Sequence, residues 1–200
     1  MRRLATLAAA LFLVGATAAH GEPKPASLNP ADAPAGTYVL DKTHASLTAS
    51  LSHEGLSHYT MRFDGLDASF TYDPKAPQAS TVQASIDANS LDVGAPKISA
   101  QFARQFLAGD EKPQITFTST SIVYTGDHGT MTGDLTLRGV TRPVILDVTF
   151  NGTGPGLLGG HRMGFSASGD IKRSDFGSKA WLSLVGDDVH IVIEAEFQRK

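Results

Sequence analysis

Apolar and polar residues alternate along most of the chain between residues 45 and 197. In residues 45–51 (ASLTASL), the odd positions are apolar and the even positions carry hydroxyl groups. Successive side chains of a β-strand point to opposite faces, so each such segment predicts a strand with one apolar face. Eight segments show this pattern: residues 45–51, 59–63, 82–88, 114–118, 131–137, 144–150, 163–171 and 189–197.

Turn signals separate several of these segments. They are Asp73-Pro74, Gly126-Asp127, Arg138-Gly139 and Asn151-Gly152, pairs of residues that favour tight turns. Eight amphipathic strands joined by short connections predict an all-β fold, an eight-stranded antiparallel barrel whose closure leaves no exposed sheet edge. A sandwich of two sheets would show the same strands and remains the alternative.

One segment has a helical period instead. Ile98, Phe102 and Phe106 are four residues apart within residues 96–107 (PKISAQFARQFL), which places them on one face of a helix. Pro96 suits the start of a helix and Gly109 its end. We expect a short helix that caps one barrel mouth, with its two phenylalanines either filling the core or forming a lid over an apolar cavity.

Several positions on the predicted apolar faces are small. An eight-stranded barrel is just wide enough to be filled by its own side chains or to hold one small ligand. Small residues inside favour open volume, although a narrow or flattened barrel would also explain them. They are Ala45, Ala49, Ala84, Ala88, Gly133, Ala167, Gly169 and Ala195.

The N-terminal residues have the pattern of an export signal. Arg2 and Arg3 precede an uncharged apolar stretch over residues 4–15, which is too short to span a bilayer, and Ala16-Thr17-Ala18 is a typical cleavage site. We therefore expect a signal peptide at residues 1–18, a disordered leader rich in proline and alanine at residues 19–36, and one barrel domain at residues 37–200. The expected location is the periplasm.

Composition narrows the range of partners and chemistry. The formal net charge is −3, and loss of Arg2 and Arg3 with the signal peptide would make the chain more acidic, which argues against a nucleic-acid partner. The chain has no cysteine, so its stability must come from the core alone. We expect no stable insertion into a membrane.

Candidate catalytic and metal-binding residues do not form a recognisable set. His53 and His58 have no third ligand at a suitable spacing, and we interpret His44 as a hydrogen-bonded histidine at the rim. Residues 154–159 match GxGxxG, but a strand pattern follows them where a dinucleotide site needs a helix, so we interpret them as a hairpin loop. The sequence predicts no enzyme, no metal site and no resident cofactor.

Longer motifs resemble a known family. Residues 114–120 (QITFTST), 131–152 (MTGDLTLRGVTRPVILDVTFNG) and 163–177 (MGFSASGDIKRSDFG) are similar to the central motifs of the YceI-like family, and residues 38–63 resemble its opening motif. The similarity covers about residues 37–199. We interpret the Arg138–Pro143 and Lys172–Gly177 stretches as turn motifs, with Gly139 supplying backbone freedom and Asp175 bonding to the backbone.

The resemblance implies a lipocalin-like barrel with an elongated apolar tunnel that binds a long isoprenoid lipid, either a polyprenyl lipid or an isoprenoid quinone. Trp181 is the only tryptophan of the chain and is expected to close a mouth or to cover the core. From strand parity, the residues expected to contact the ligand are Leu47, Leu51, Phe63, Ile86, Phe102, Phe106, Phe117, Leu135, Leu146, Phe165 and Ile191.

Three alternatives stay open at this point. An enzyme could act on a lipid in the same cavity, although no residue set supports one. A ligand-free structural barrel could bind a protein partner or a second copy of itself, so that a homodimer is left open. An outer-membrane barrel would need its apolar faces outward, and an apolar face alone does not fix that orientation.

Overall fold

The structure is a computed structural model that describes residues 26–156 and 159–200. Its strands are β1 (Gly36–His53), β2 (Ser57–Phe63), β3 (Leu66–Tyr72), β4 (Val82–Asp87), β5 (Leu91–Asp92), β6 (Gln114–Thr125), β7 (His128–Leu137), β8 (Val140–Pro155), β9 (His161–Lys172) and β10 (Val185–Arg199). Its helices are α1 (Pro96–Leu107) and the short 3-10 turns η1 (Pro30–Asp32), η2 (Pro77–Ala79), η3 (Ala88–Ser90) and η4 (Arg173–Phe176).

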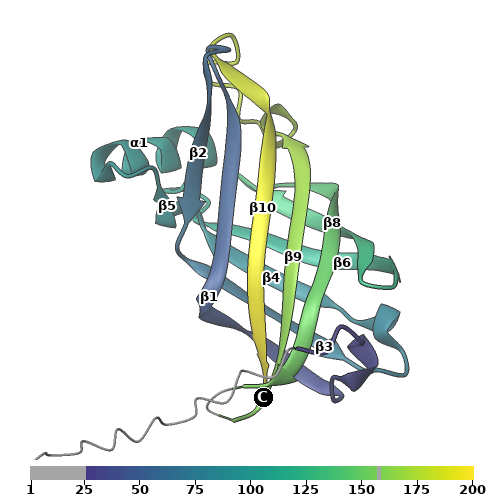
Figure 1. The fold of residues 1–200 in the computed structure, drawn as a ribbon. Helices are drawn as coiled ribbons and strands as arrows, with labels where there is room; N and C mark the ends of the chain where they lie inside the picture. The colour runs from purple at the N-terminus through teal and green to yellow at the C-terminus, as the bar shows by residue number, and fades with distance from the viewer. Residues whose placement is uncertain (1–25, 157–158) are drawn as a thin grey trace, which may run out of the picture.

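Eight of the described strands close into an antiparallel barrel (Figure 1). The ring runs β1-β3-β4-β6-β7-β8-β9-β10 and returns to β1, because β10 pairs with β1 along most of its length. This confirms the predicted eight-stranded barrel and excludes the two-sheet sandwich. The long strands β1, β8 and β10 form the tall wall that Figure 1 shows from the front.

The ring differs from the expected one in a single strand. Residues 66–72 (LDASFTY) form β3, which pairs with the first part of β1 and with β4, but the sequence analysis did not include them among the eight. Residues 57–63 form β2, which was included but lies outside the closed ring. It pairs with the second half of β1, at Leu47–His53, and with the two-residue β5.

Three predicted turns are confirmed and one is corrected. Asp73-Pro74 begins a turn after β3, in which the amide of Ala76 donates to the carbonyl of Asp73 at 2.9 Å. Gly126-Asp127 and Arg138-Gly139 connect β6 to β7 and β7 to β8, and both Arg138 and Gly139 have the positive φ that a tight hairpin turn needs. Asn151-Gly152 is not a turn, because β8 continues through it. A register shift in the β8–β9 pairing at this point makes it a β-bulge, with Gly152 at φ 141°.

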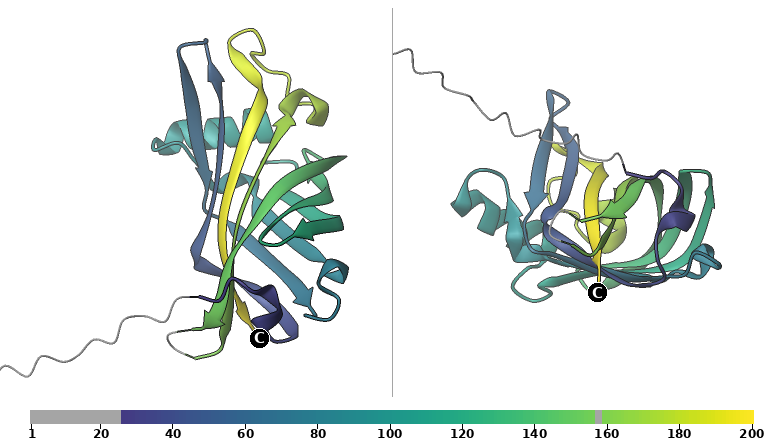
Figure 2. Two further views of the ribbon diagram at one scale, coloured as in Figure 1. Left: turned by 45° about the vertical axis from the view of Figure 1, so that its right-hand side comes forward. Right: turned by 60° about the horizontal axis from the view of Figure 1, so that its bottom comes forward.

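Helix α1 covers the predicted residues and lies beside the ring rather than within it, as the two turned views show (Figure 2). It packs against β5 and η3. Its buried residues are Ser99 and Ala103, whereas Ile98 is exposed. The buried face of the helix is therefore centred one residue later than expected, on Ser99 and Ala103 instead of Ile98. These two small side chains allow the helix to approach its neighbours closely.

Residues 26–36 are ordered, which differs from the expected disordered leader. Ser27 pairs with Thr153, and Ala33 is fully buried. The hydroxyls of Tyr38 and Tyr72 donate to the carbonyls of Pro34 and Pro30 at 2.8 and 2.7 Å. Proline carbonyls are good acceptors for such buried hydroxyls, and these bonds hold the segment against one end of the barrel. The expected signal peptide lies outside the described residues.

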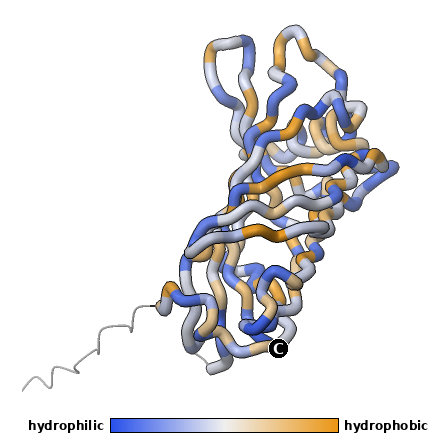
Figure 3. Tube along the Cα trace, turned by 90° about the vertical axis from the view of Figure 1, so that its right-hand side faces the viewer, coloured by the Kyte–Doolittle hydropathy of each residue, from blue (hydrophilic) through white to orange (hydrophobic). Residues whose placement is uncertain are grey.

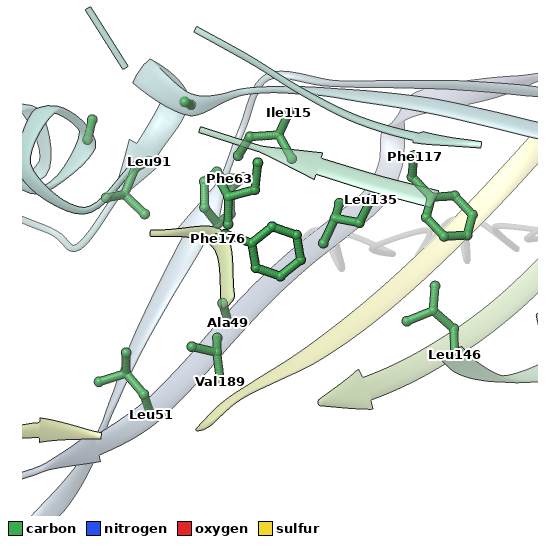
Figure 4. Packing of buried hydrophobic residues seen from close by; sticks show 13 residues of the cluster. Ala49, Leu51, Phe63, Leu91, Ile115, Phe117, Leu135, Leu146, Phe176 and Val189 are labelled. Carbon is green, nitrogen blue, oxygen red and sulfur yellow. The ribbon is translucent and has the colours of Figure 1, made fainter. Parts of the chain in front are cut away.

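The apolar faces of the strands point into the barrel and the polar faces point outward. Figure 3 shows the resulting alternation of colours along the strands, and Figure 4 shows side chains from opposite walls, such as Phe117 on β6 and Val189 on β10, directed into the same interior. The structure thereby fixes the orientation that the sequence left open. Among the described helices, none is long and apolar enough to cross a membrane.

Candidate functional site

An elongated cavity occupies the interior of the barrel. Its volume is about 430 Å³ and its lining is almost wholly apolar. This volume falls within the range of roughly 300–1,000 Å³ that is typical of small-molecule sites. Every strand of the ring contributes side chains to the lining, and β2 and α1 add to it from outside the ring.

The lining extends along most of the barrel. On β1 it runs from Leu40 to His53, and on β10 it runs from Val185 to Phe197. At about 3.3 Å per residue, either stretch spans about 40 Å. The cavity therefore suits a long, thin apolar molecule better than a compact one.

All eleven residues predicted to contact a ligand lie in the lining of this cavity. Leu51, Phe63, Phe117, Leu135 and Leu146 are buried and also belong to the main core cluster. The other six are only partly buried although they point inward, which is the behaviour expected of side chains that face open volume. Their contact with a ligand stays a prediction.

One end of the cavity is closed by packed aromatic rings that also line it, and we call it the tyrosine end. It is formed by Tyr38, Phe70, Tyr72, Phe150, Phe165 and Phe197. Phe70 is at its centre, stacked on Tyr38 with 5.2 Å between ring centroids and meeting Phe197 edge-on at 5.0 Å. Burial raises the pKa of both tyrosines, that of Tyr72 to about 12, so both stay neutral donors to the proline carbonyls. This end is packed as a core.

The other end carries a looser aromatic set, and we call it the tryptophan end. It consists of Tyr59, Phe102, Phe106 and Trp181 in a chain of ring contacts with centroids 5.3–6.0 Å apart. Phe102 and Phe106 are partly buried, and Trp181 both lines the cavity and remains 47% exposed. Trp181 therefore stands between the cavity and solvent, and the two helix phenylalanines face the cavity as a lid would.

A buried arginine organises the tryptophan end. The guanidinium of Arg173 donates four hydrogen bonds of 2.8–2.9 Å to the carbonyls of Ser178, Ala180, Val185 and Gly186. Its charged group also lies 5.6 Å from the centre of the Phe106 ring, a favourable cation–π distance. Arg173 thus ties the β9–β10 loop, residues 177–184, to the helix that lines the cavity.

The neighbouring carboxylates correct one expectation for this region. Asp187, which is part of β10, accepts hydrogen bonds from the backbone amide and hydroxyl of Ser174 at 2.8 and 2.7 Å. These bonds hold the pKa of Asp187 below its usual value. Asp187 therefore makes the side-chain-to-backbone contact that the sequence analysis assigned to Asp175, which is exposed.

The sequence analysis missed the contribution of β3 to the cavity. Leu66, Ala68, Phe70 and Tyr72 line it from this strand. Their period-two spacing in LDASFTY is the same signal that identified the other strands. Arg173 was also missed as an organising residue. No local pattern identifies its role, because its four acceptors are backbone carbonyls of the loop and of the first two residues of β10.

The most prominent polar cluster lies on the outside of the barrel. It is centred on Asp41, where β1 bulges between Leu40 and Ala45. The carboxylate of Asp41 accepts a hydrogen bond from the hydroxyl of Thr43 at 2.6 Å and lies 3.0 Å from His44 Nδ1. It also forms an ion pair with Arg162 at 2.9 Å. The Thr43 hydroxyl, followed by His44, lowers the pKa of Asp41 to about 2. His44 is thus hydrogen-bonded, as expected. Within residues 26–156 and 159–200, no group of side chains could hold a metal ion.

Comparisons with known proteins agree with the geometry. A family model described as a YceI-like domain matches residues 38–197. Protein YceI of Shigella flexneri is 39% identical over 165 residues, which cover 81% of this chain and 86% of that protein. The same protein of Escherichia coli O157:H7 is equally similar.

Solved structures share the barrel. BcnA of Burkholderia cenocepacia has a TM-score of 0.70 and 25% identity, covering 78% of this chain and 98% of BcnA. A polyisoprenoid binding domain from Saccharophagus degradans has a TM-score of 0.61 and 18% identity, covering 82% of this chain and 98% of that domain. The second likeness concerns the fold.

Proposed function

This chain belongs to the YceI-like family, and from that premise we propose that its barrel binds a long isoprenoid lipid, a polyprenyl lipid or the tail of an isoprenoid quinone, and carries it through the periplasm. The observation that carries the proposal is the elongated apolar cavity, whose lining continues for about 40 Å along β1 and β10. The polyisoprenoid binding domain from Saccharophagus degradans, which shares the fold, supports the same ligand class.

The hydrophobic effect supplies the driving force for such binding. Each Å² of apolar surface removed from water stabilises the complex by about 25 cal/mol, so burial of some 400 Å² would contribute about 10 kcal/mol before the entropic costs of association. Few polar groups point into the cavity, and four of the five N–H groups of the Arg173 guanidinium are already bonded to carbonyls. Recognition would therefore rest on shape and apolarity rather than on a polar head group.

The same lack of polar groups favours a carrier over an enzyme. General acid–base or nucleophilic chemistry needs a titratable or nucleophilic side chain within reach of the reacting atoms. Among the described residues, the Asp41–His44 and Asp170–His190 contacts lie outside the cavity lining. The third, Asp127–His128, is in the lining only at its exposed rim, with 3.6 Å between the two side chains. A periplasmic location rests on the signal-peptide pattern at residues 1–18, and N-terminal sequencing of the mature protein would test it.

Native mass spectrometry of the protein purified from its own host, followed by lipid extraction, tests the binding proposal. We expect a bound mass that matches an isoprenoid quinone or polyprenyl lipid. A protein that is empty and also fails to take up added isoprenoids would overturn the proposal.

A further inference from the structure

We propose that the tryptophan end docks reversibly on the surface of a lipid bilayer through an apolar rim, made of Leu56 in the β1–β2 turn and of Trp181, Leu182 and Leu184 in the β9–β10 loop. This inference rests on the proposed function, because an isoprenoid carrier has to exchange its ligand with a membrane. It names the partner surface at which that exchange takes place.

The rim is a cluster of large apolar side chains that the fold leaves in solvent. Leu56 is 82% exposed, Leu184 52%, Trp181 47% and Leu182 41%. The two loops are joined, because the amide of Glu54 donates to the carbonyl of Leu184 at 2.7 Å. Both stand at the end of the barrel away from the C-terminus (Figure 1), and Figure 3 shows hydrophobic positions in both. Apolar patches of this kind mark interaction sites.

The β9–β10 loop is held rigidly in this exposed conformation. Trp181 has a φ of 54°, a left-handed conformation that is costly for a bulky residue. The carbonyl of Trp181 accepts from the amides of Leu184 and Val185 at 2.9 and 2.8 Å, and Arg173 binds the loop carbonyls of Ser178 and Ala180. A buried arginine and a strained backbone thus hold Trp181 and two leucines in solvent. Exposure of these side chains does not stabilise the fold, so we infer that they serve to contact a partner.

A bilayer fits this surface better than a protein partner does. A stable protein interface involves roughly 20–30 residues a side, whereas the rim has four. Insertion of a few apolar side chains, with tryptophan at the level of the head groups, is enough for reversible membrane attachment. The rim segments, residues 54–58 and 178–184, carry one glutamate and one lysine, so that no net charge opposes contact with acidic lipids.

The position of the rim agrees with this role. Trp181 belongs both to the rim and to the cavity lining, so a docked barrel would open its cavity toward the acyl chains. The lining also reaches exposed residues of the β6–β7 turn, but Asp127 and His128 are charged or polar there and Val123 is the only large exposed apolar side chain among the described residues of that hairpin. The tryptophan end is therefore the better bilayer contact.

The sole tryptophan makes the test direct. Ligand-free protein is mixed with vesicles of phosphatidylethanolamine and phosphatidylglycerol that contain no isoprenoid, and binding is followed by co-sedimentation and by the emission of Trp181. We expect co-sedimentation with a blue shift of the emission and little dependence on salt. The double variant Leu182→Ser/Leu184→Ser should lower the partition coefficient about tenfold, whereas the matched variant Ile145→Ser/Val192→Ser, on the outer wall, should leave it unchanged.

Isoprenoid uptake from detergent micelles, measured on the same proteins, separates this inference from the proposed function. Leu182 and Leu184 are not part of the cavity lining, so uptake should persist in their variant. If the parent protein took up isoprenoid normally but did not bind vesicles, the docking inference alone would be overturned. Equal losses of vesicle binding in the two double variants would overturn it as well. Rim-dependent vesicle binding without isoprenoid uptake would support docking and overturn the proposed ligand.

Discussion

The two ends of the barrel are both built from aromatic rings, but they use them in opposite ways. At the tyrosine end, Tyr38, Phe70 and Phe197 are no more than 7% exposed, and the tyrosine hydroxyls are anchored to the ordered residues 26–36. At the tryptophan end, Phe102 and Phe106 are only partly buried and Trp181 is half exposed. The first arrangement stabilises the fold, and the second leaves a path between cavity and solvent. Substitutions at the two ends should therefore separate stability from binding.

The largest effect on stability is expected from Phe70→Ala at the tyrosine end. Phe70 packs on Tyr38, Phe165 and Phe197, and its truncation in a packed core should cost about 3–5 kcal/mol of unfolding free energy. Urea denaturation measures this loss. A stability loss below about 1 kcal/mol would show that this end is not a packed core.

Replacement of Arg173 tests how the tryptophan end is held. Arg173→Met should lower the unfolding free energy by about 3 kcal/mol, because four carbonyls, that of Ser178 buried and the others partly buried, lose a charged donor. Arg173→Lys keeps the charge, but an ammonium group cannot reproduce the planar array of guanidinium donors. Its unfolding free energy should therefore lie between those of the parent protein and of Arg173→Met. If both variants were as stable as the parent protein in urea, the loop would have to be held by other contacts.

Asp41 connects β1 to β9 on the outside of the barrel. It should contribute to the decrease of the unfolding free energy at acid pH. Folding holds its pKa at about 2, below the usual 3.8, so its stabilising contribution is present above pH 4 and is lost as the pH falls toward 2. Asp41→Asn should cost about 1–2 kcal/mol at neutral pH and flatten the decline between pH 4 and pH 2. An unchanged slope in that range would assign the acid sensitivity to other carboxylates.

The smallest effect on stability is expected at Trp181. Trp181→Gly loses the contact with Phe106, worth about 1 kcal/mol, but it relieves the left-handed backbone at φ 54°, which costs a non-glycine residue a similar amount. Thermal unfolding should therefore shift little, while isoprenoid affinity falls about tenfold with the lost apolar contact. A large loss of stability with unchanged affinity would reverse the roles assigned to the two ends.

The sequence predicts the walls of the barrel better than its ends. Strand parity placed nine candidate residues in the cavity lining, and the helical period placed Phe102 and Phe106 there, because both patterns depend only on neighbouring residues. The same rule would have found β3, whose alternation in LDASFTY was overlooked, and its omission left Phe70 out of the predicted site. Asn151-Gly152 has the composition of a turn, but long-range pairing with β9 carries β8 through it as a bulge.

The features at the two ends depend on contacts between distant segments. Residues 30–34 appear unstructured in sequence because their order comes from the hydroxyls of Tyr38 and Tyr72. Arg173 appears as an ordinary charged residue because its partners are carbonyls of a loop that has no pattern of its own. Neither arrangement follows from periodicity or from local propensity.

The central claim is that the interior of the barrel holds the lipid, and two adjacent residues of β9 test it most directly. Ala167 points into the cavity, whereas Ser168 is not part of the lining. Isoprenoid uptake is measured for Ala167→Phe and for Ser168→Phe, after circular dichroism has shown that both are folded. We expect the inward phenylalanine to abolish uptake and the outward one to leave it at the parent level. Equal uptake by the two variants would contradict an interior binding site.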